Sequence, residues 1–277
     1  MFNKKLAFSF SLVFVFIFSN YTAVNSFAQT KAEPEIDNEY QVGAILFHQK
    51  AAEYRALTYQ AFNLAKMRLD ADKKESKHLP KAERKKPRAI IVDADETVLD
   101  NSPYQAKLFK ENKAFSIEDF LEWKKSGKSK AVPGSVEFLN YAKKQGVEIF
   151  YVSNVPNSFK EVTIENLKQN GFPDAKPENV MLITDTGSKE PRRQKVAETH
   201  RVVMLIGDSL NDLSVAFEGK STAERFAEAD KIKDQWGMKF IVIPNVMYGA
   251  WESAVYENKR LSDNEKKSKR NETLEIY

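Results

Sequence analysis

The sequence predicts an α/β protein in which a parallel sheet is covered by helices on both faces. Short apolar runs alternate with longer segments whose apolar residues have helical spacing, and the runs span residues 89–92, 147–152, 180–183, 202–206 and 240–243. Strands that are buried on both faces read as continuous apolar runs, and their alternation with helices is typical of a parallel sheet. We assign this core to residues 87–257 and expect a polar C-terminal tail over 258–277, which is a candidate for disorder.

Residues 1–28 have the features of a cleaved signal peptide. Lys4 and Lys5 precede an apolar stretch over 6–18, and small residues lead to an expected cleavage after Ala28. An uncleaved membrane anchor is the alternative, but the apolar stretch is shorter than the roughly 20 residues that span a bilayer. The sequence contains no cysteine, which excludes disulfides and a lipid-bearing cysteine. We therefore expect a periplasmic or secreted protein without a stable membrane anchor after signal cleavage.

Residues 29–86 are predicted to form an N-terminal helical segment and a basic linker. Apolar residues at helical spacing predict one face of a helix that starts near residue 37 and packs on the main domain; they are Tyr54, Leu57, Ala61 and Leu64. The basic stretch over 73–88 could bind nucleic acid, but it has prolines and glutamates and no aromatic residue to stack on bases. We interpret it as a solvated linker and expect no nucleic-acid partner.

Polar residues follow the predicted strands where an open parallel sheet binds its ligands. They are Asp93 and Asp95 after the first run, Ser153 and Asn154 after the second, and Asp208 and Asp212 after the run over 202–206, with Lys189 near the start of a helical stretch. Each alone is common as a helix cap, a turn or a surface lysine. Their shared position at strand ends favours a site, because independent capping would not place them together.

This set of side chains suits phosphoryl transfer. Mg²⁺ is typically held by one or two carboxylates plus substrate and water, and we assign Asp93 and Asp208 to it. An aspartate can attack phosphorus to form an aspartyl phosphate, while Asp95 gives a proton to the leaving oxygen and later takes one from water. A lysine, a hydroxyl and loop amides can bind the phosphate oxygens.

Two motifs carry a resemblance to a known family. Asp93-Ala-Asp-Glu-Thr-Val-Leu-Asp-Asn-Ser-Pro-Tyr104 and Ile206-Gly-Asp-Ser-Leu-Asn-Asp212 resemble the paired signature of the class C bacterial acid phosphatases, the lipoprotein e-like 5'-nucleotidase family of the haloacid dehalogenase superfamily. Segments 133–138, 150–154 and 244–252 are also similar, and the likeness runs from about residue 38 to 257. It implies a haloacid dehalogenase-like Rossmannoid sheet with a small N-terminal helical subdomain.

The resemblance also implies an activity and residue roles. It implies a metal-dependent phosphomonoesterase, most active at acid pH, that acts on small phosphomonoesters including nucleoside 5'-monophosphates. Asp93 would be nucleophile and metal ligand, Asp95 the acid/base that also offers its backbone carbonyl to the metal, and Asp208 the second carboxylate ligand. Asp212 would contact metal-bound water or orient Lys189. The phosphate-binding residues would be Ser153, Asn154 and Lys189.

Two aromatic residues would stack on the base of a nucleotide, and the resemblance places them at Phe120 and Tyr248. Phe120 also has the spacing of a helix's core face together with Phe115 and Trp123, which is a purely structural alternative. Val155 stands where relatives often carry arginine, which puts a substrate contact from that position in doubt. Ala94 is smaller than the usual leucine or isoleucine, and we expect this to affect packing rather than chemistry.

Three matters stay open at the level of sequence. A phosphotransferase that passes the phosphoryl group to an alcohol would use the same residues, and a catalytically weak nucleotide-binding protein would have the same fold. The presence of Asp93 argues against a storage or binding protein that has lost its nucleophile. A homodimer is neither required nor excluded.

Overall fold

The computed structural model describes residues 38–277 of the chain. The predicted signal peptide lies outside this range, so cleavage after Ala28 stays a prediction. Within 38–277, every helix is too short or too polar to cross a bilayer.

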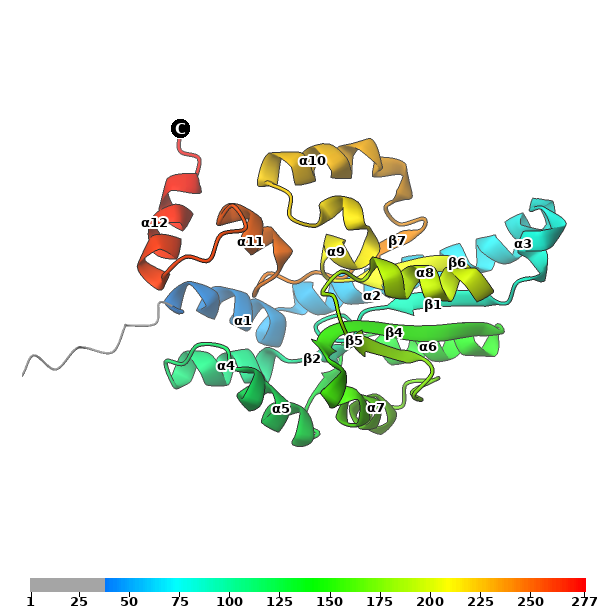
Figure 1. Cartoon of the computed structure of the whole chain (residues 1–277), viewed down its shortest axis with the longest axis horizontal. Coiled ribbons are helices and arrows are strands. Elements are labelled where there is room, and N and C mark those ends of the chain that lie inside the picture. The colour runs from blue at the N-terminus through cyan, green and yellow to red at the C-terminus, as the bar shows by residue number, and fades with distance from the viewer. Residues whose placement is uncertain (1–37) are drawn as a thin grey trace, which may run out of the picture. The chain divides into compact units, whose positions relative to one another are not determined.

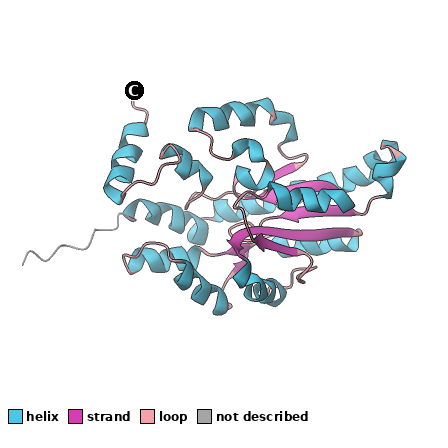
Figure 2. Cartoon of the chain, in the orientation of Figure 1, coloured by secondary structure: helices cyan, strands magenta, loops and turns pink. Residues whose placement is uncertain are grey.

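The centre of the fold is a parallel sheet, whose strands are magenta in Figure 2. It has five strands in the order β5-β4-β1-β6-β7. Its strands are β1 (Arg88–Val92), β4 (Val147–Pro156), β5 (Val180–Ile183), β6 (Arg201–Gly207) and β7 (Phe240–Val242). Each of the predicted apolar runs forms one of them, which confirms the predicted sheet. β4 continues beyond the predicted end at residue 152, so Ser153 and Asn154 lie within a strand and not after it.

Helices of varied length connect these strands. The α-helices are α1 (Val42–Lys50), α2 (Ala52–Glu75), α3 (Lys81–Lys85), α4 (Ser102–Lys110), α5 (Ile117–Lys125), α6 (Ser135–Lys144), α7 (Lys160–Gln169), α8 (Glu190–Thr199), α9 (Leu210–Leu213), α10 (Thr222–Lys231), α11 (Ala250–Val255) and α12 (Asp263–Thr273). Short 3-10 helices are η1 (Glu39–Gln41), η2 (Ser76–His78), η3 (Asn157–Phe159), η4 (Val215–Phe217) and η5 (Lys233–Gln235).

Alternate residues of β1 face opposite sides of the sheet, and each side has its own apolar core. Ile90 and Val92 belong to the larger cluster, which contains residues of α2, α6 and α7. Ala89 and Ile91 belong to a smaller cluster with residues of α8 and α9. This is the predicted arrangement of helices on both faces of the sheet (Figure 1), and residues 89–92 of the central strand are all buried.

The N-terminal helices belong to the same compact unit as the sheet. The backbone bends at Ala51, with ψ of 128°, so α1 and α2 are separate helices where one was predicted. The predicted face of α2 is also wrong in part, because Leu57 and Leu64 are exposed. The buried residues are Tyr54, Thr58, Phe62, Ala65 and Leu69. Apolar residues thus lie on two overlapping faces of α2. The face that is buried is the one that contacts α6.

Two predicted irregular segments contain helices. The basic stretch over 73–88 includes the end of α2, η2 and α3, so it is folded rather than an open linker. In the polar tail, α12 begins with a capping box in which Ser262 and Glu265 satisfy each other's backbone N–H groups. The expectation of a disordered tail is therefore wrong for Asp263–Thr273.

The segment between β1 and β4 contains elements that were not predicted. β2 (Leu99–Asp100) and β3 (Lys130–Ala131) form a two-stranded antiparallel sheet, and α4 and α5 lie between them in the chain. This insertion follows Asp93 and Asp95 directly, so it brings α4 and α5 to the carboxyl end of the sheet.

We predict that His48 makes the fold sensitive to acid. The imidazole accepts a hydrogen bond from the Val246 backbone N–H (3.4 Å) and packs on Tyr54. Burial lowers the pKa of His48 to about 4 from 6.5, against an opposing effect of Asp100. Between pH 6.5 and about 4, His48 is therefore protonated in the unfolded chain but largely neutral in the folded chain. The contribution of neutral His48 to stability is complete above pH 6.5 and is lost as the pH falls towards 4.

Urea unfolding of the wild type and of His48→Gln at pH 7 and pH 4.5 tests this prediction. We expect the difference in unfolding free energy between the two proteins to fall by about 2–3 kcal/mol at the lower pH. A difference that does not change with pH would contradict it.

Candidate active site

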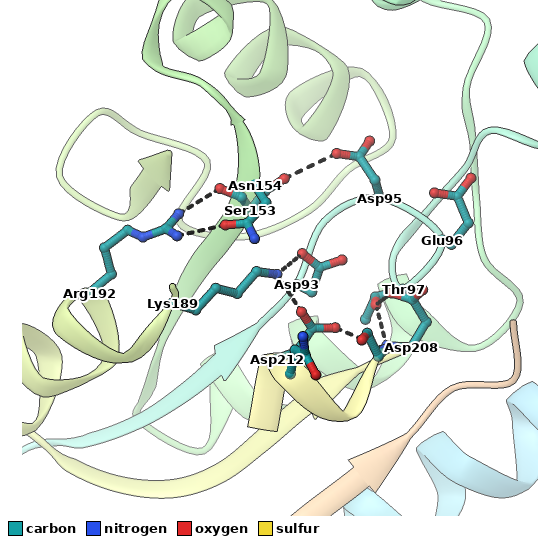
Figure 3. Close-up of polar contacts among 12 residues, drawn as sticks. Asp93, Asp95, Glu96, Thr97, Ser153, Asn154, Lys189, Arg192, Asp208 and Asp212 are labelled. Atoms are coloured by element: carbon teal, nitrogen blue, oxygen red, sulfur yellow. Dashed lines mark hydrogen bonds and ion pairs between the residues drawn. The ribbon is translucent and has the colours of Figure 1, made fainter. Parts of the chain in front are cut away.

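Asp93 lies directly after β1, at the carboxyl end of the central strand. Its backbone N–H donates to the Ile206 carbonyl of β6 (2.9 Å), which anchors it between the two strands. The side chain is 7% exposed and accepts a hydrogen bond from the ammonium group of Lys189. Lys189 is the N-cap residue of α8, and its Nζ also pairs with Asp212 Oδ1 (2.7 Å), so one buried lysine joins two of the predicted carboxylates (Figure 3).

Asp208 follows β6 and is held by two neutral donors. Thr97 Oγ1 donates to its Oδ1 and Asn245 Nδ2 donates to its Oδ2, both at 2.8 Å. Burial, together with the charge of Asp212, raises the pKa of Asp208 to about 6. Gly207 allows the Asp212 side chain to approach the backbone closely, because a Cβ at position 207 would overlap with that side chain.

Carboxylate oxygens of Asp93, Asp208 and Asp212 all lie within 4.8 Å of one another. Three carboxylates with one ammonium group, that of Lys189, leave a formal charge of minus two. Burial raises the pKa of Asp93 well above its usual range; Lys189 opposes this effect, and Asp212 and Asp208 add to it. Oxygen ligands with this uncompensated charge fit a hard divalent cation, and transition metals that prefer sulfur or imidazole would find no such ligand in the cluster.

Asp95 has a different environment from Asp93, although the two residues are neighbours. Its Oδ1 accepts from Lys124 Nζ (2.5 Å) and Asn101 Nδ2 (2.9 Å), and its Oδ2 accepts from Ser153 Oγ (3.1 Å). Burial favours the neutral form of Asp95, but the charge and hydrogen bond of Lys124 outweigh burial and lower its pKa. Lys124 itself is 1% exposed, so this ion pair is inside the protein.

The end of β4 that carries Ser153 and Asn154 is fixed by an arginine from α8. Arg192 donates to the Ser153 carbonyl (2.7 Å) and to Asn154 Oδ1 (2.6 Å), as Figure 3 shows. Arg192 also donates to the Ser188 carbonyl (3.0 Å), and so it connects the end of β4 to the segment before Lys189. Val155 is buried at 7% exposure and contributes no charge there. The side chain that holds the end of β4 by hydrogen bonds is thus Arg192 of α8.

Glu96 supports the turn that follows the paired aspartates. It has φ of 62°, in the left-handed region that non-glycine residues rarely adopt, and its side chain is 1% exposed. Its carboxylate accepts from the Asn101 backbone N–H (3.2 Å) and from the Tyr248 hydroxyl. Burial and the charge of Asp95 raise the pKa of Glu96 well above its usual range. A strained, fully enclosed residue next to Asp95 indicates that the turn is held by its side-chain contacts.

A cavity of about 640 Å³ opens over these residues. Its lining residues include Asp93, Asp95, Asp208, Asp212, Ser153 and Lys189, together with Phe115, Phe120, Tyr248, Lys113 and Lys266. Phe120 is only 6% exposed and packs against Tyr104, whereas Phe115 is 58% exposed with its ring 5.7 Å from that of Phe120. Phe115 is therefore the more accessible of the two phenylalanines that line the cavity, whereas the sequence indicated Phe120.

All the predicted polar site residues are brought to this one end of the sheet. Sequence reasoning missed Lys124, Arg192, Glu96, Thr97 and Asn245. Thr97 and Glu96 stand inside the first motif and Asn245 inside the segment 244–252, so their place in those motifs was the available signal. Nothing in the sequence distinguishes Lys124 and Arg192 from the other lysines and arginines.

Comparisons with known proteins agree with this geometry. Residues 19–251, well over half of the chain, match a family described as HAD superfamily, subfamily IIIB (acid phosphatase). The fold is similar to that of the class C acid phosphatase from Bacillus anthracis, with 39% identity and a TM-score of 0.80 over 86% of this chain and 98% of that chain. A second structure of that enzyme, with tungstate bound, matches equally well.

Two plant proteins are similar over shorter segments. Acid phosphatase 1 of Solanum lycopersicum is 30% identical over 129 residues, 44% of this chain and 51% of that protein. Vegetative storage protein 1 of Arabidopsis thaliana is 30% identical over 131 residues, 44% of this chain and 48% of that protein. The chain thus matches about half the length of these curated relatives. By its fold and by the match over residues 19–251, the chain belongs to the acid phosphatases of subfamily IIIB in the HAD superfamily.

Proposed function

We propose that this protein is a metal-dependent acid phosphatase that hydrolyses small phosphomonoesters, including nucleoside 5'-monophosphates, through an aspartyl phosphate on Asp93. The proposal rests mainly on the position of the Asp93 carboxylate. It follows β1, lines the cavity, pairs with Lys189 and lies next to Asp208 and Asp212. A storage protein of the same family would need the fold but not this arrangement of charges.

In the first step, a carboxylate oxygen of Asp93 attacks phosphorus and the bond from phosphorus to the leaving oxygen breaks. Lys189 and the Ser153 hydroxyl bind the phosphoryl oxygens, as point charge and hydrogen-bond donor. Asp95, in its protonated form, gives the proton to the leaving alcohol. In the second step water attacks phosphorus, the Asp93 carboxylate leaves, and Asp95 takes the proton from water. Lys124 favours the ionised form of Asp95, which is the form that accepts this proton.

Asp93 and Asp208 would hold the cation, with the Asp95 backbone carbonyl, and Asp212 orients Lys189 through their 2.7 Å contact. We propose Mg²⁺ because the available ligands are carboxylate and carbonyl oxygens. Bound there, the ion supplies positive charge that screens the anionic substrate from the Asp93 carboxylate.

We also propose export to the periplasm or the medium, on the basis of the signal-peptide features over residues 1–28. Exported phosphatases meet nucleotides and other phosphate esters outside the cytoplasm, which agrees with the proposed substrates. Fractionation of the producing cells, with amino-terminal sequencing of the recovered protein, tests both export and the expected start at residue 29.

Asp93→Asn should lower phosphate release by at least about a thousandfold, because it removes the nucleophile's charge while its volume hardly changes. Release from an aryl phosphate and from a nucleoside 5'-monophosphate, at acid and neutral pH, measures this. The matched control is Asp263→Asn, which removes a carboxylate from the lining of the same cavity. Circular dichroism should show an intact fold for both variants. Substantial residual turnover in Asp93→Asn would contradict the mechanism.

Metal should stabilise the wild type against unfolding, since it offsets the repulsion among three closely packed carboxylates. In chelator-treated protein at neutral pH, we expect added Mg²⁺ to raise the melting temperature, and Asp208→Asn to abolish most of that rise. Calorimetry measures the effect without reference to activity. An equal rise in the wild type and in Asp208→Asn would show that the ion binds elsewhere.

Phe115→Ala should raise KM for a nucleoside 5'-monophosphate by about tenfold, because stacking on a base contributes roughly 1–3 kcal/mol. KM for a small alkyl phosphate, which has no ring to stack, should hardly change. Phe226→Ala removes another exposed phenylalanine, 66% exposed on α10 and not among the cavity lining, and is the control. Equal changes in KM for both substrates would mean that Phe115 does not contact the base.

A further inference from the structure

The basic stretch over 73–88 forms part of a second hollow, away from the candidate active site. This hollow has a volume of about 460 Å³, and its cationic lining residues are Lys73, Lys77, Arg84, Lys86, Arg88 and Arg201. Arg84 Nη1 donates to the Lys77 carbonyl (3.5 Å), which folds α3 back towards η2. The basic residues thus surround a concave surface, which a solvated linker would not form.

The hollow lies at the opposite end of the sheet from Asp93. Arg88 begins β1 and Arg201 begins β6, and the two are paired in the parallel register. The candidate active site follows the other ends of the same strands. Because β1 has five residues, the two sites are roughly 15 Å apart or more along the strand. Figure 1 shows α3 at the end of the sheet where β1 starts.

Two arginines of the hollow are held in place before any ligand arrives. Arg201 donates two hydrogen bonds to the Asp72 carboxylate, at 2.6 and 2.9 Å. Arg88 contacts Asp72 at 3.5 Å and donates to the Gln145 carbonyl (2.5 Å). Their side chains are 13% and 17% exposed. Fixed guanidinium groups lose little freedom when they bind an anion, which favours a site over a diffuse patch.

The charge of the hollow exceeds what its acidic neighbours neutralise. Asp72 pairs with both arginines and Glu83 pairs with Lys86 (3.5 Å). Six cations with two carboxylates leave a formal charge of plus four. Among the described residues that line the hollow, none is aromatic, so nothing there would stack on a nucleic-acid base. The size is that of a small-molecule site.

We propose that this hollow binds a soluble polyphosphate anion, a small molecule that carries several phosphate charges. Arginine and lysine donors suit phosphate oxygens, and four net positive charges match an anion of comparable charge better than a single phosphate. Arg88 and Arg201 form the fixed part of the site, and Lys73, Lys77 and Arg84 line it from α2, η2 and α3. The proposal does not depend on the chemistry proposed for Asp93.

Calorimetric titration with tripolyphosphate tests the site. The titration uses chelator and the Asp93→Asn background, so that turnover does not contribute heat. Lys77→Gln with Arg84→Gln should weaken binding by at least about tenfold, since each removes a charged hydrogen-bond donor. Lys74→Gln with Lys81→Gln is the matched control: it removes the same charge from the same stretch, at exposed positions that do not line the hollow. We expect less than a twofold effect from it.

Three results would overturn the proposal. Equal weakening by the two double variants would show that the stretch attracts anions only through its overall charge. The absence of saturable tripolyphosphate binding would leave no such site. Binding of phosphatidylglycerol vesicles without binding of tripolyphosphate would make the face a membrane contact. Melting temperatures establish that both double variants are folded, and Lys77→Gln alone, which leaves Arg84 in place, should show part of the loss.

Discussion

The close packing of three carboxylates, two of them paired with one lysine, is the constraint on which the site depends. Asp93, Asp208 and Asp212 lie within 4.8 Å of one another, and their mutual repulsion is offset by Lys189, by neutral donors and by whatever cation binds. Like charges stay this close together only where the surrounding backbone and hydrogen bonds hold them in position. Here the strands do so: the backbone N–H of Asp93 is bonded to β6, and Asp208 is held through Thr97 and Asn245. The same negative charge that costs stability in the free protein favours the binding of a cation, and we propose that the bound cation and Lys189 attract the phosphoryl group.

The two neighbouring aspartates differ in role because their surroundings differ. Lys124 and Ser153 hold Asp95 away from the cluster, so it does not share the environment that raises the pKa of Asp93. This difference agrees with the roles that we propose, attack on phosphorus for Asp93 and proton transfer for Asp95. Arg192 connects the end of β4 that carries Ser153 to the segment before Lys189, so it fixes the positions of the two proposed phosphate-binding residues relative to each other. The insertion between β1 and β4 adds Phe115 and Phe120 to the cavity lining. We therefore expect this insertion, which lies outside the main sheet, to contact the leaving group of the substrate.

Prediction from the sequence identified the sheet and the polar residues of the site. Buried parallel strands appear as continuous apolar runs, and ligands bind at the carboxyl ends of such strands. Prediction failed where tertiary contact decides. Leu57 and Leu64 have the same helical spacing as the residues that α2 buries, and Lys124 stands in a run of charged residues that looks solvated yet is 1% exposed. The helix α12 lacks an apolar face, although its capping box, Ser262 with Glu265, was readable. Phe115 and Phe120 differ in exposure only because of the way α4 and α5 pack.

The most direct test of the account is to locate the phosphoryl group on the enzyme during turnover. Protein mixed rapidly with a radiolabelled phosphomonoester would be quenched in acid, digested and mapped by mass spectrometry. The account predicts an acid-stable, base-labile phosphoryl group on Asp93, in the peptide that follows β1. A burst of released alcohol with the phosphoryl group on any other residue would contradict the central claim that Asp93 is the nucleophile.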